Sequence, residues 1–131
     1  MKQQTALHNF MRVNGKSLSY NAQLKAQFKT LSMAYLRKLK SELQFTECKV
    51  SFNAGGIAVS GDAHLMGMFS NGIGVYITIN ESWNNRNSMT FLFRTIKNMK
   101  DYTGGPNNYF NDEHLQGEVV MNNIKSLCNV S

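Results

Sequence analysis

The fold of this chain is constrained most by a helical pattern of apolar residues that changes abruptly into an alternating pattern. From Asn21 to Gln44, apolar residues recur every three or four positions, with no glycine or proline between them. They are Leu24, Phe28, Leu31, Tyr35, Leu39 and Leu43. Asn21 suits the N-cap position, because its side-chain oxygen accepts hydrogen bonds from the free amides of a first helical turn. The sequence therefore predicts a core-packing helix over residues 21–44.

After this helix, apolar and polar residues alternate, which is the pattern of strands with one buried face. In the first strand, Cys48, Val50 and Phe52 alternate with polar residues. The predicted strands cover about residues 48–53, 57–69, 73–79 and 89–96. The second contains a bulge signal at Gly61-Asp62. Asn71-Gly72 is a strong signal for a two-residue hairpin turn, and such short turns predict an antiparallel meander.

The remaining segments complete the predicted architecture. Residues 1–19 are polar and are expected to form a flexible arm, while residues 98–111 read as a glycine-containing loop. A last helix is expected over residues 112–128, although Gly117 lowers its propensity. The prediction is one α+β domain over residues 20–131. In it, two helices cover one face of a four-stranded antiparallel sheet, in the order α-β-β-β-β-α.

Composition limits the compartment and the class of protein. The chain has 131 residues and a formal charge of +6, which fits one domain. No apolar run is long enough to span a bilayer, and Met1–Phe10 lacks the apolar core of a signal peptide. Two cysteines, Cys48 and Cys128, are too few for a disulfide framework. We therefore expect a cytoplasmic protein with reduced thiols and no membrane partner.

The positive charge is concentrated in two regions. Residues 1–49 carry a net charge of +7, whereas residues 50–131 carry −1. On the predicted helix the basic residues share a flank beside the apolar stripe: Lys25, Lys29, Arg37 and Lys40. This flank is either a solvated helix face or a surface that meets phosphate or an acidic protein.

The second basic region leads into a loop that combines cations, rings and amides. Its cations are Arg94, Lys97 and Lys100, at three-residue intervals. Tyr102, Tyr109 and Phe110 interleave with Gly104-Gly105 and with the amides of Asn107 and Asn108. Bases stack on aromatic side chains while lysine and arginine hold phosphates, so the segment is a candidate contact surface. The alternative is a turn that returns the chain to the sheet with its aromatic side chains packed below.

Catalytic and metal-binding motifs are weak. Ser60, Asp62 and His64 alternate along one run, but residues two apart in a strand lie about 7 Å apart, too far for a direct proton relay. Glu47 and Lys49 match half of a metal-dependent nuclease motif, whose acidic partner on an adjacent strand is missing. The histidines and cysteines have no metal-ligand spacing. We expect no enzymatic activity, no cofactor and no metal, with a small enzyme around Ser60, Asp62, His64 or Glu81 as a third interpretation.

The loop also carries a resemblance. Residues 94–107 read Arg-Thr-x-Lys-x-x-Lys-Asp-Tyr-Thr-Gly-Gly-x-Asn and follow strands containing Val-x-Phe-Asn and Val-Ser-Gly. Over about residues 45–110 this resembles small, mostly uncharacterised proteins of bacterial phages and mobile elements, and the size is similar to that of anti-CRISPR proteins. The resemblance implies an accessory protein in the bacterial cytoplasm that inhibits a host defence nuclease, or its nucleic-acid complex, by binding it.

Two hypotheses of function follow. The first is this non-catalytic inhibitor, with the basic loop as its contact surface. The second is a small basic protein that binds DNA or RNA directly. The order of elements is similar to that of a double-stranded RNA-binding domain, but this chain has an additional strand, and acidic Asp112-Glu113 opens its last helix.

Overall fold

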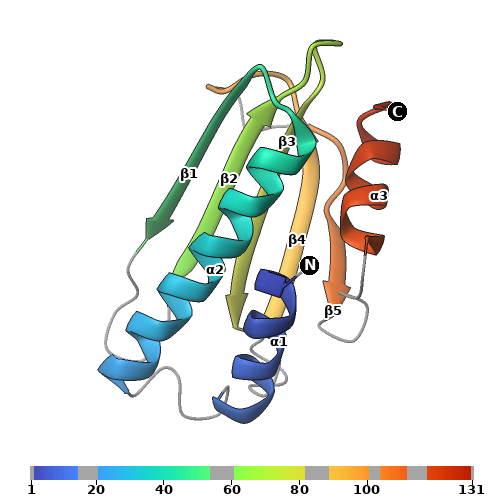
Figure 1. Cartoon of the computed structure of the whole chain (residues 1–131). Coiled ribbons are helices and arrows are strands. Elements are labelled where there is room, and N and C mark those ends of the chain that lie inside the picture. The colour runs from blue at the N-terminus through green and yellow to red at the C-terminus, as the bar shows by residue number, and fades with distance from the viewer. Residues whose placement is uncertain are drawn as a thin grey trace.

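The computed structural model is a two-layer α+β structure (Figure 1). It describes residues 2–14, 21–53, 61–81, 89–100, 104–111 and 118–130. The helices are α1 (Lys2–Asn14), α2 (Ala22–Leu43) and α3 (Val119–Leu127). The strands are β1 (Glu47–Asn53), β2 (Asp62–Met68), β3 (Gly74–Glu81), β4 (Met89–Ile96) and β5 (Asn108–Asn111). No helix in these ranges is long and apolar enough to cross a membrane.

The sheet is an antiparallel meander with strands in the order β1-β2-β3-β4-β5. This confirms the predicted fold class, with five strands where the sequence predicts four. The added strand, β5, falls in the predicted loop and pairs with β4, Tyr109 lying opposite Leu92. The Asn108 side chain supports it by donating to the carbonyl oxygens of Phe93, at 3.4 Å, and Pro106, at 3.1 Å. The pairing of β5 with β4 is nonlocal, so the periodicity of this short polar segment does not reveal it.

The helix α2 forms as predicted and organises the core. The Asn21 side chain accepts hydrogen bonds from the amides of Gln23 and Leu24, both at 3.0 Å, and so caps the first turn. The apolar stripe packs against β1 and β2, and the ring of Tyr35 stacks on Phe91 of β4 with centroids 6.0 Å apart. Since α2 covers the sheet on this face, the core lies between the two layers.

The N-terminal segment differs from the predicted flexible arm. Residues 2–14 form α1, which packs against α2, and the side chains of Leu7 and Met11 are fully buried. Two residues four apart lie on the same side of a helix, so this pair makes a narrow apolar stripe. Because the stripe is short and lies among polar residues, it gives a weak helical signal in the sequence. The helix is stabilised mainly by tertiary packing.

The C-terminal helix is shorter in the described structure than the sequence predicts. The helix α3 begins at Val119, and residues 112–117 of the predicted helix lie outside the described residues. The predicted turn at Asn71-Gly72 lies between β2 and β3, with Gly72 at a positive φ of 86°, but the connection is longer than the predicted two-residue turn, because β2 ends at Met68 and β3 begins at Gly74. Asn71 Nδ2 donates to the carbonyl oxygens of Cys128, at 2.8 Å, and Asn129, at 3.3 Å. The hairpin turn therefore holds the end of α3.

Candidate functional site: the open face of the sheet

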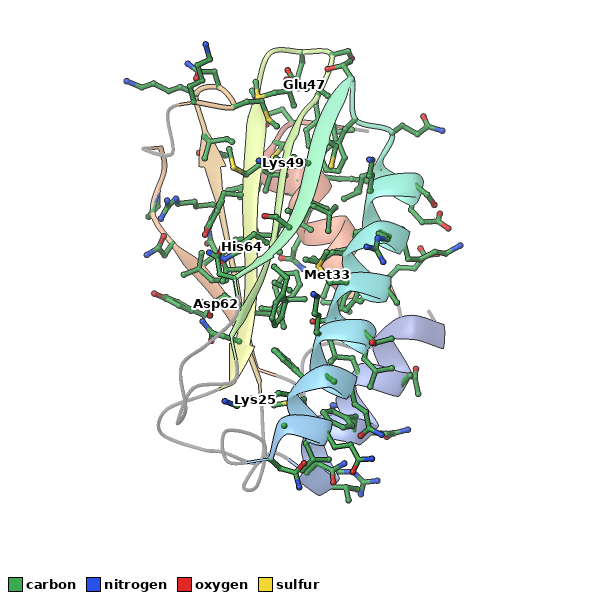
Figure 2. All side chains as sticks on the ribbon, turned by 90° about the vertical axis from the view of Figure 1, so that its left-hand side faces the viewer. Lys25, Met33, Glu47, Lys49, Asp62 and His64 are labelled. Carbon is green, nitrogen blue, oxygen red and sulfur yellow. The ribbon has the colours of Figure 1, made fainter. Side chains whose placement is uncertain are left out.

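The described helices lie on one face of the sheet and leave its other face open (Figures 1 and 2). Strand alternation places successive side chains on opposite faces, so every second residue of each strand points to the open side. On β1 these are Glu47, Lys49, Ser51 and Asn53, while Cys48, Val50 and Phe52 contact the core. On β1 the open face is therefore lined by polar side chains, whereas β2 and β4 add the apolar side chains of Met66 and Leu92.

Antiparallel register places residues from distant parts of the sequence in rows across this face. One row contains Lys49, Met66, Tyr76 and Arg94. The next row contains Ser51, His64, Thr78, Leu92 and Tyr109. Neighbouring strands lie about 4.8 Å apart, so each row crosses the sheet from β1 to β4 or β5 in about 14–19 Å. The rows bring cations, rings and hydroxyls into one surface.

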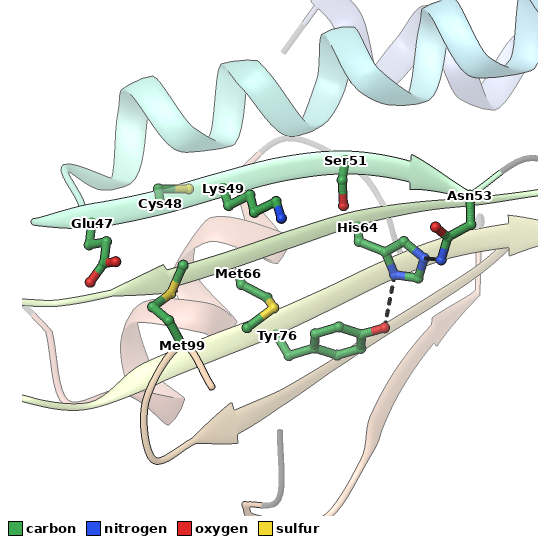
Figure 3. A pocket seen from close by; sticks show the side chains of 9 residues that line it. All are labelled: Glu47, Cys48, Lys49, Ser51, Asn53, His64, Met66, Tyr76 and Met99. Atoms are coloured by element: carbon green, nitrogen blue, oxygen red, sulfur yellow. Dashed lines mark hydrogen bonds between the residues drawn. The ribbon is translucent and has the colours of Figure 1, made fainter. Parts of the chain in front are cut away.

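His64 is the centre of a hydrogen-bond network on this face (Figure 3). Asn53 Nδ2 donates to His64 Nε2 at 3.0 Å. A ring nitrogen that accepts carries no proton, so in the neutral ring the proton is on Nδ1. That nitrogen lies 2.8 Å from the hydroxyl of Tyr76 and 3.3 Å from the hydroxyl of Thr78. Both ring nitrogens are therefore engaged.

The surroundings of His64 favour its neutral form. Partial burial lowers the pKa of His64 below its ordinary value of 6.5, and the negative charge of Asp62 opposes this shift. The network acts in the same direction as burial, because a proton on Nε2 would face the amide donor of Asn53. At neutral pH the ring is thus an uncharged, oriented part of the surface.

Arg94 and Tyr76 form a second pair on the open face. The guanidinium carbon of Arg94 lies 4.8 Å from the centroid of the Tyr76 ring, within range of a cation–π interaction. Arg94 Nη1 also donates to Asn107 Oδ1 at 3.3 Å, while its buried Nε has no hydrogen-bond partner among the described residues. The ring and the amide hold the guanidinium plane over β3 and β4.

A groove of about 440 Å³ follows the β1 side of this face (Figure 3). Its lining is mainly polar and comes from three strands and from the loop after β4: Glu47, Cys48, Lys49, Ser51, Asn53, His64, Met66, Tyr76 and Met99. The exposed Lys49 forms no ion pair with any residue that the structure describes. The groove therefore offers a cation with no described ion-pair partner beside an uncharged imidazole and a phenol ring, with the carboxylate of Glu47 in the same lining.

The third interpretation, a small enzyme around Ser60, Asp62, His64 or Glu81, falls partly outside the described residues. Ser60 lies outside the described residues, and Asp62 pairs in register with Asn53. Ser51 is opposite His64, but within the described contacts the ring bonds to Asn53, Tyr76 and Thr78 instead. In the part of the chain that the structure describes, no three histidine, cysteine or acidic side chains gather as a metal site.

Three of the candidate residues in the basic loop meet on the open face. Arg94 contacts Asn107, and Asn107 Nδ2 donates to the Tyr109 hydroxyl at 3.5 Å. Lys97 and Lys100 are exposed after β4, whereas Asn108 is turned to the carbonyls of Phe93 and Pro106. Tyr102 lies outside the described residues. The structure thus assembles part of the predicted contact surface and gives Asn108 a structural role.

The candidate residues of the first basic region belong to the helix layer. Lys29 Nζ lies 5.6 Å from the centroid of Phe52, a core-facing residue of β1. Arg37 and Lys40 are exposed on α2, and Lys25 is partly buried there. The basic flank of α2 and the basic loop after β4 therefore lie in different layers of the molecule and do not form one surface.

The predicted contact surface did not include Lys49, Asn53, His64 or Tyr76, which lie on the open face. Their signal in the sequence is their alternation with the apolar residues of the strands. Alternation shows which residues share a face within one strand. Only the register between strands shows that Lys49 and Arg94 belong to the same row.

The fold and the site together define a two-layer α+β protein with a polar, aromatic and cationic open sheet face. Comparison with known protein families, with curated protein sequences and with solved structures finds no match to this chain.

Proposed function

We propose that this chain is a non-catalytic binding protein that inhibits a host defence nuclease or its nucleic-acid complex, using the open face of the sheet. The observation that carries the proposal is the row from Lys49 to Arg94. It sets two cations and the Tyr76 ring on a face that the described helices leave uncovered. A surface of this kind can bind a partner without catalysing a reaction.

The state of His64 supports a binding role rather than a catalytic one. A general base needs a nitrogen that is available to the proton it removes. His64 Nε2 is occupied by Asn53, and Nδ1 is directed to Tyr76 and Thr78. The imidazole in this arrangement fixes the shape of the surface. The resemblance to small proteins of phages and mobile elements supplies the proposed setting.

The test is cleavage of target DNA by a panel of CRISPR effectors and restriction enzymes in the presence of the purified protein. We expect at least one enzyme to be inhibited. The Lys49→Glu variant should weaken that inhibition at least about tenfold, because it places a like charge against the partner. Arg37→Glu is the matched control, since Arg37 is exposed on α2 in the other layer. Undiminished cleavage across the panel would contradict the proposed function.

A further inference from the structure

We propose that the open face binds single-stranded nucleic acid, with Tyr109 and Arg94 as stacking surfaces and Lys49 as a phosphate contact. The inference rests on the proposed function, because it names the class of partner that the same face binds. It also locates nucleic-acid binding on the sheet rather than on the basic flank of α2.

The first step concerns the surfaces available for stacking. Tyr109 is 61% exposed although it lies within the sheet, opposite Leu92. In the neighbouring row, the guanidinium of Arg94 covers the Tyr76 ring and is held by Asn107. Unpaired bases stack on aromatic rings and on arginine planes in nucleic-acid-binding proteins. The face therefore presents two neighbouring stacking surfaces, one from β5 and one from β4.

The second step concerns charge. Among the described side chains, four cations lie on the open face or on the loop after β4: Lys49, Arg94, Lys97 and Lys100. The acidic residues of β1 and β2, Glu47 and Asp62, lie at opposite ends of the β1–β2 pair. Lys49 is exposed, unpaired within the described residues, and separated from Arg94 by two strands. This spacing allows a polyanionic backbone to cross the sheet between the two cations.

The third step selects a single strand over other partners. A broad sheet face does not enter the groove of a duplex as a helix does, whereas it can hold splayed bases. A protein partner would need a buried apolar centre to anchor it. The groove instead offers Asn53, Ser51 and the ring of Tyr76, with Met66 and Met99 as its fully apolar side chains. Amides and hydroxyls suit base edges, which carry both donors and acceptors.

The experiment measures fluorescence anisotropy of labelled 12-nucleotide oligomers of dT, dA and rU, and of a duplex of the same length, with the full chain. We expect the single strands to bind at about 50 mM salt and more tightly than the duplex. The affinity should fall as salt rises, because binding releases counterions from the phosphates. Binding of none of the single strands at this salt concentration would overturn the inference.

Two pairs of variants locate the contact. Tyr109→Ala should weaken binding about 5- to 150-fold, the range expected for one stacked base, whereas Tyr109→Phe should keep nearly full affinity. The plot of log K against log salt has a negative slope. Lys49→Gln should make this slope less steep by about 0.7, the value for one phosphate contact on a single strand. Arg37→Gln removes the same charge from α2 and should leave the slope unchanged. Circular dichroism checks that each variant is folded.

The outcomes separate this inference from the proposed function. If the oligomers bind and Tyr109→Ala and Lys49→Gln weaken binding as expected, the open face binds single strands, and the nuclease panel separately tests whether this binding serves inhibition. If binding depends on Arg37 and not on Lys49, the contact lies on α2 and the inference is overturned. If the protein inhibits a nuclease without binding any oligomer, the open face meets protein instead. The proposed function then stands without the inference.

Discussion

The hydroxyl of Tyr76 lies 2.8 Å from Nδ1 of His64, a residue of β2. This contact holds the Tyr76 ring in place, and the guanidinium of Arg94 lies over the same ring. The centroids of the two rings are 5.8 Å apart. Asn53 on β1 holds the other nitrogen of the imidazole, at 3.0 Å. Four strands thereby contribute to one oriented surface, and its geometry depends on His64 remaining neutral.

The first prediction concerns pH. Burial lowers the folded-state pKa of His64 below 6.5. As pH falls, the unfolded chain therefore binds a proton at this site at a higher pH than the folded chain does. The contribution of neutral His64 to stability is therefore complete above about pH 6.5 and is lost as pH falls through the folded-state pKa. Urea denaturation at pH 7.5 and 5.5 should show a smaller acid-induced loss for His64→Gln than for the unmodified chain. An NMR titration that places the midpoint of His64 above 6.5 would contradict this.

The second prediction concerns the hydroxyl of Tyr35, which is fully buried and has no hydrogen-bond partner within the described residues. An unpaired buried hydroxyl loses its hydration without compensation, and the same burial raises the pKa of Tyr35. Tyr35→Phe should leave the free energy of unfolding unchanged or raise it by up to about 2 kcal/mol.

The matched variant for this prediction is Tyr76→Phe, which removes a hydroxyl bonded to His64. It should lower the free energy of unfolding by about 0.5–1.5 kcal/mol. Chemical denaturation of the two variants gives both values. A loss of more than about 1 kcal/mol on Tyr35→Phe would show that this hydroxyl has a stabilising partner after all.

The third prediction concerns α1. Leu7 is fully buried, whereas Val13 on the same helix is 73% exposed. Leu7→Ala should lower the free energy of unfolding by about 2–5 kcal/mol, because it opens a cavity in the core. Val13→Ala should change it by less than about 0.5 kcal/mol. Thermal unfolding measures both. Equal, small effects would mean that residues 2–14 contribute no packing, as expected of a flexible arm.

The fourth prediction concerns the two thiols. Burial raises the pKa of Cys48 to about 11, opposed by the positive charge of Lys40, and burial likewise raises that of Cys128 to about 11. Since the thiolate is the reactive form, both should react with iodoacetamide at pH 8 far more slowly than in the unfolded chain. Cys48 is partly exposed and Cys128 is fully buried, so Cys48 should be modified first. Peptide mass spectrometry follows the order, and faster modification of Cys128 would contradict it.

Local chemistry made much of the fold predictable. The stripe from Leu24 to Leu43, the cap at Asn21 and the position of the turn at Asn71-Gly72 depend on nearby residues, so their sequence signals carry over into the structure. The turn itself is longer than the two residues predicted. The elements that differ from the predictions depend on distant partners. The helix α1 forms against α2, and β5 forms against β4.

The candidate site follows the same division. The sequence by itself determined that Lys49, Ser51 and Asn53 share one side of a strand, and that Arg94, Asn107 and Tyr109 lie in one basic, aromatic segment. Only the tertiary structure decided that these two groups share a face and that the basic residues of α2 belong to another layer. The physical reason is register: alternation fixes the face of a residue within its own strand. Its neighbours across the sheet are set by backbone pairing and core packing together.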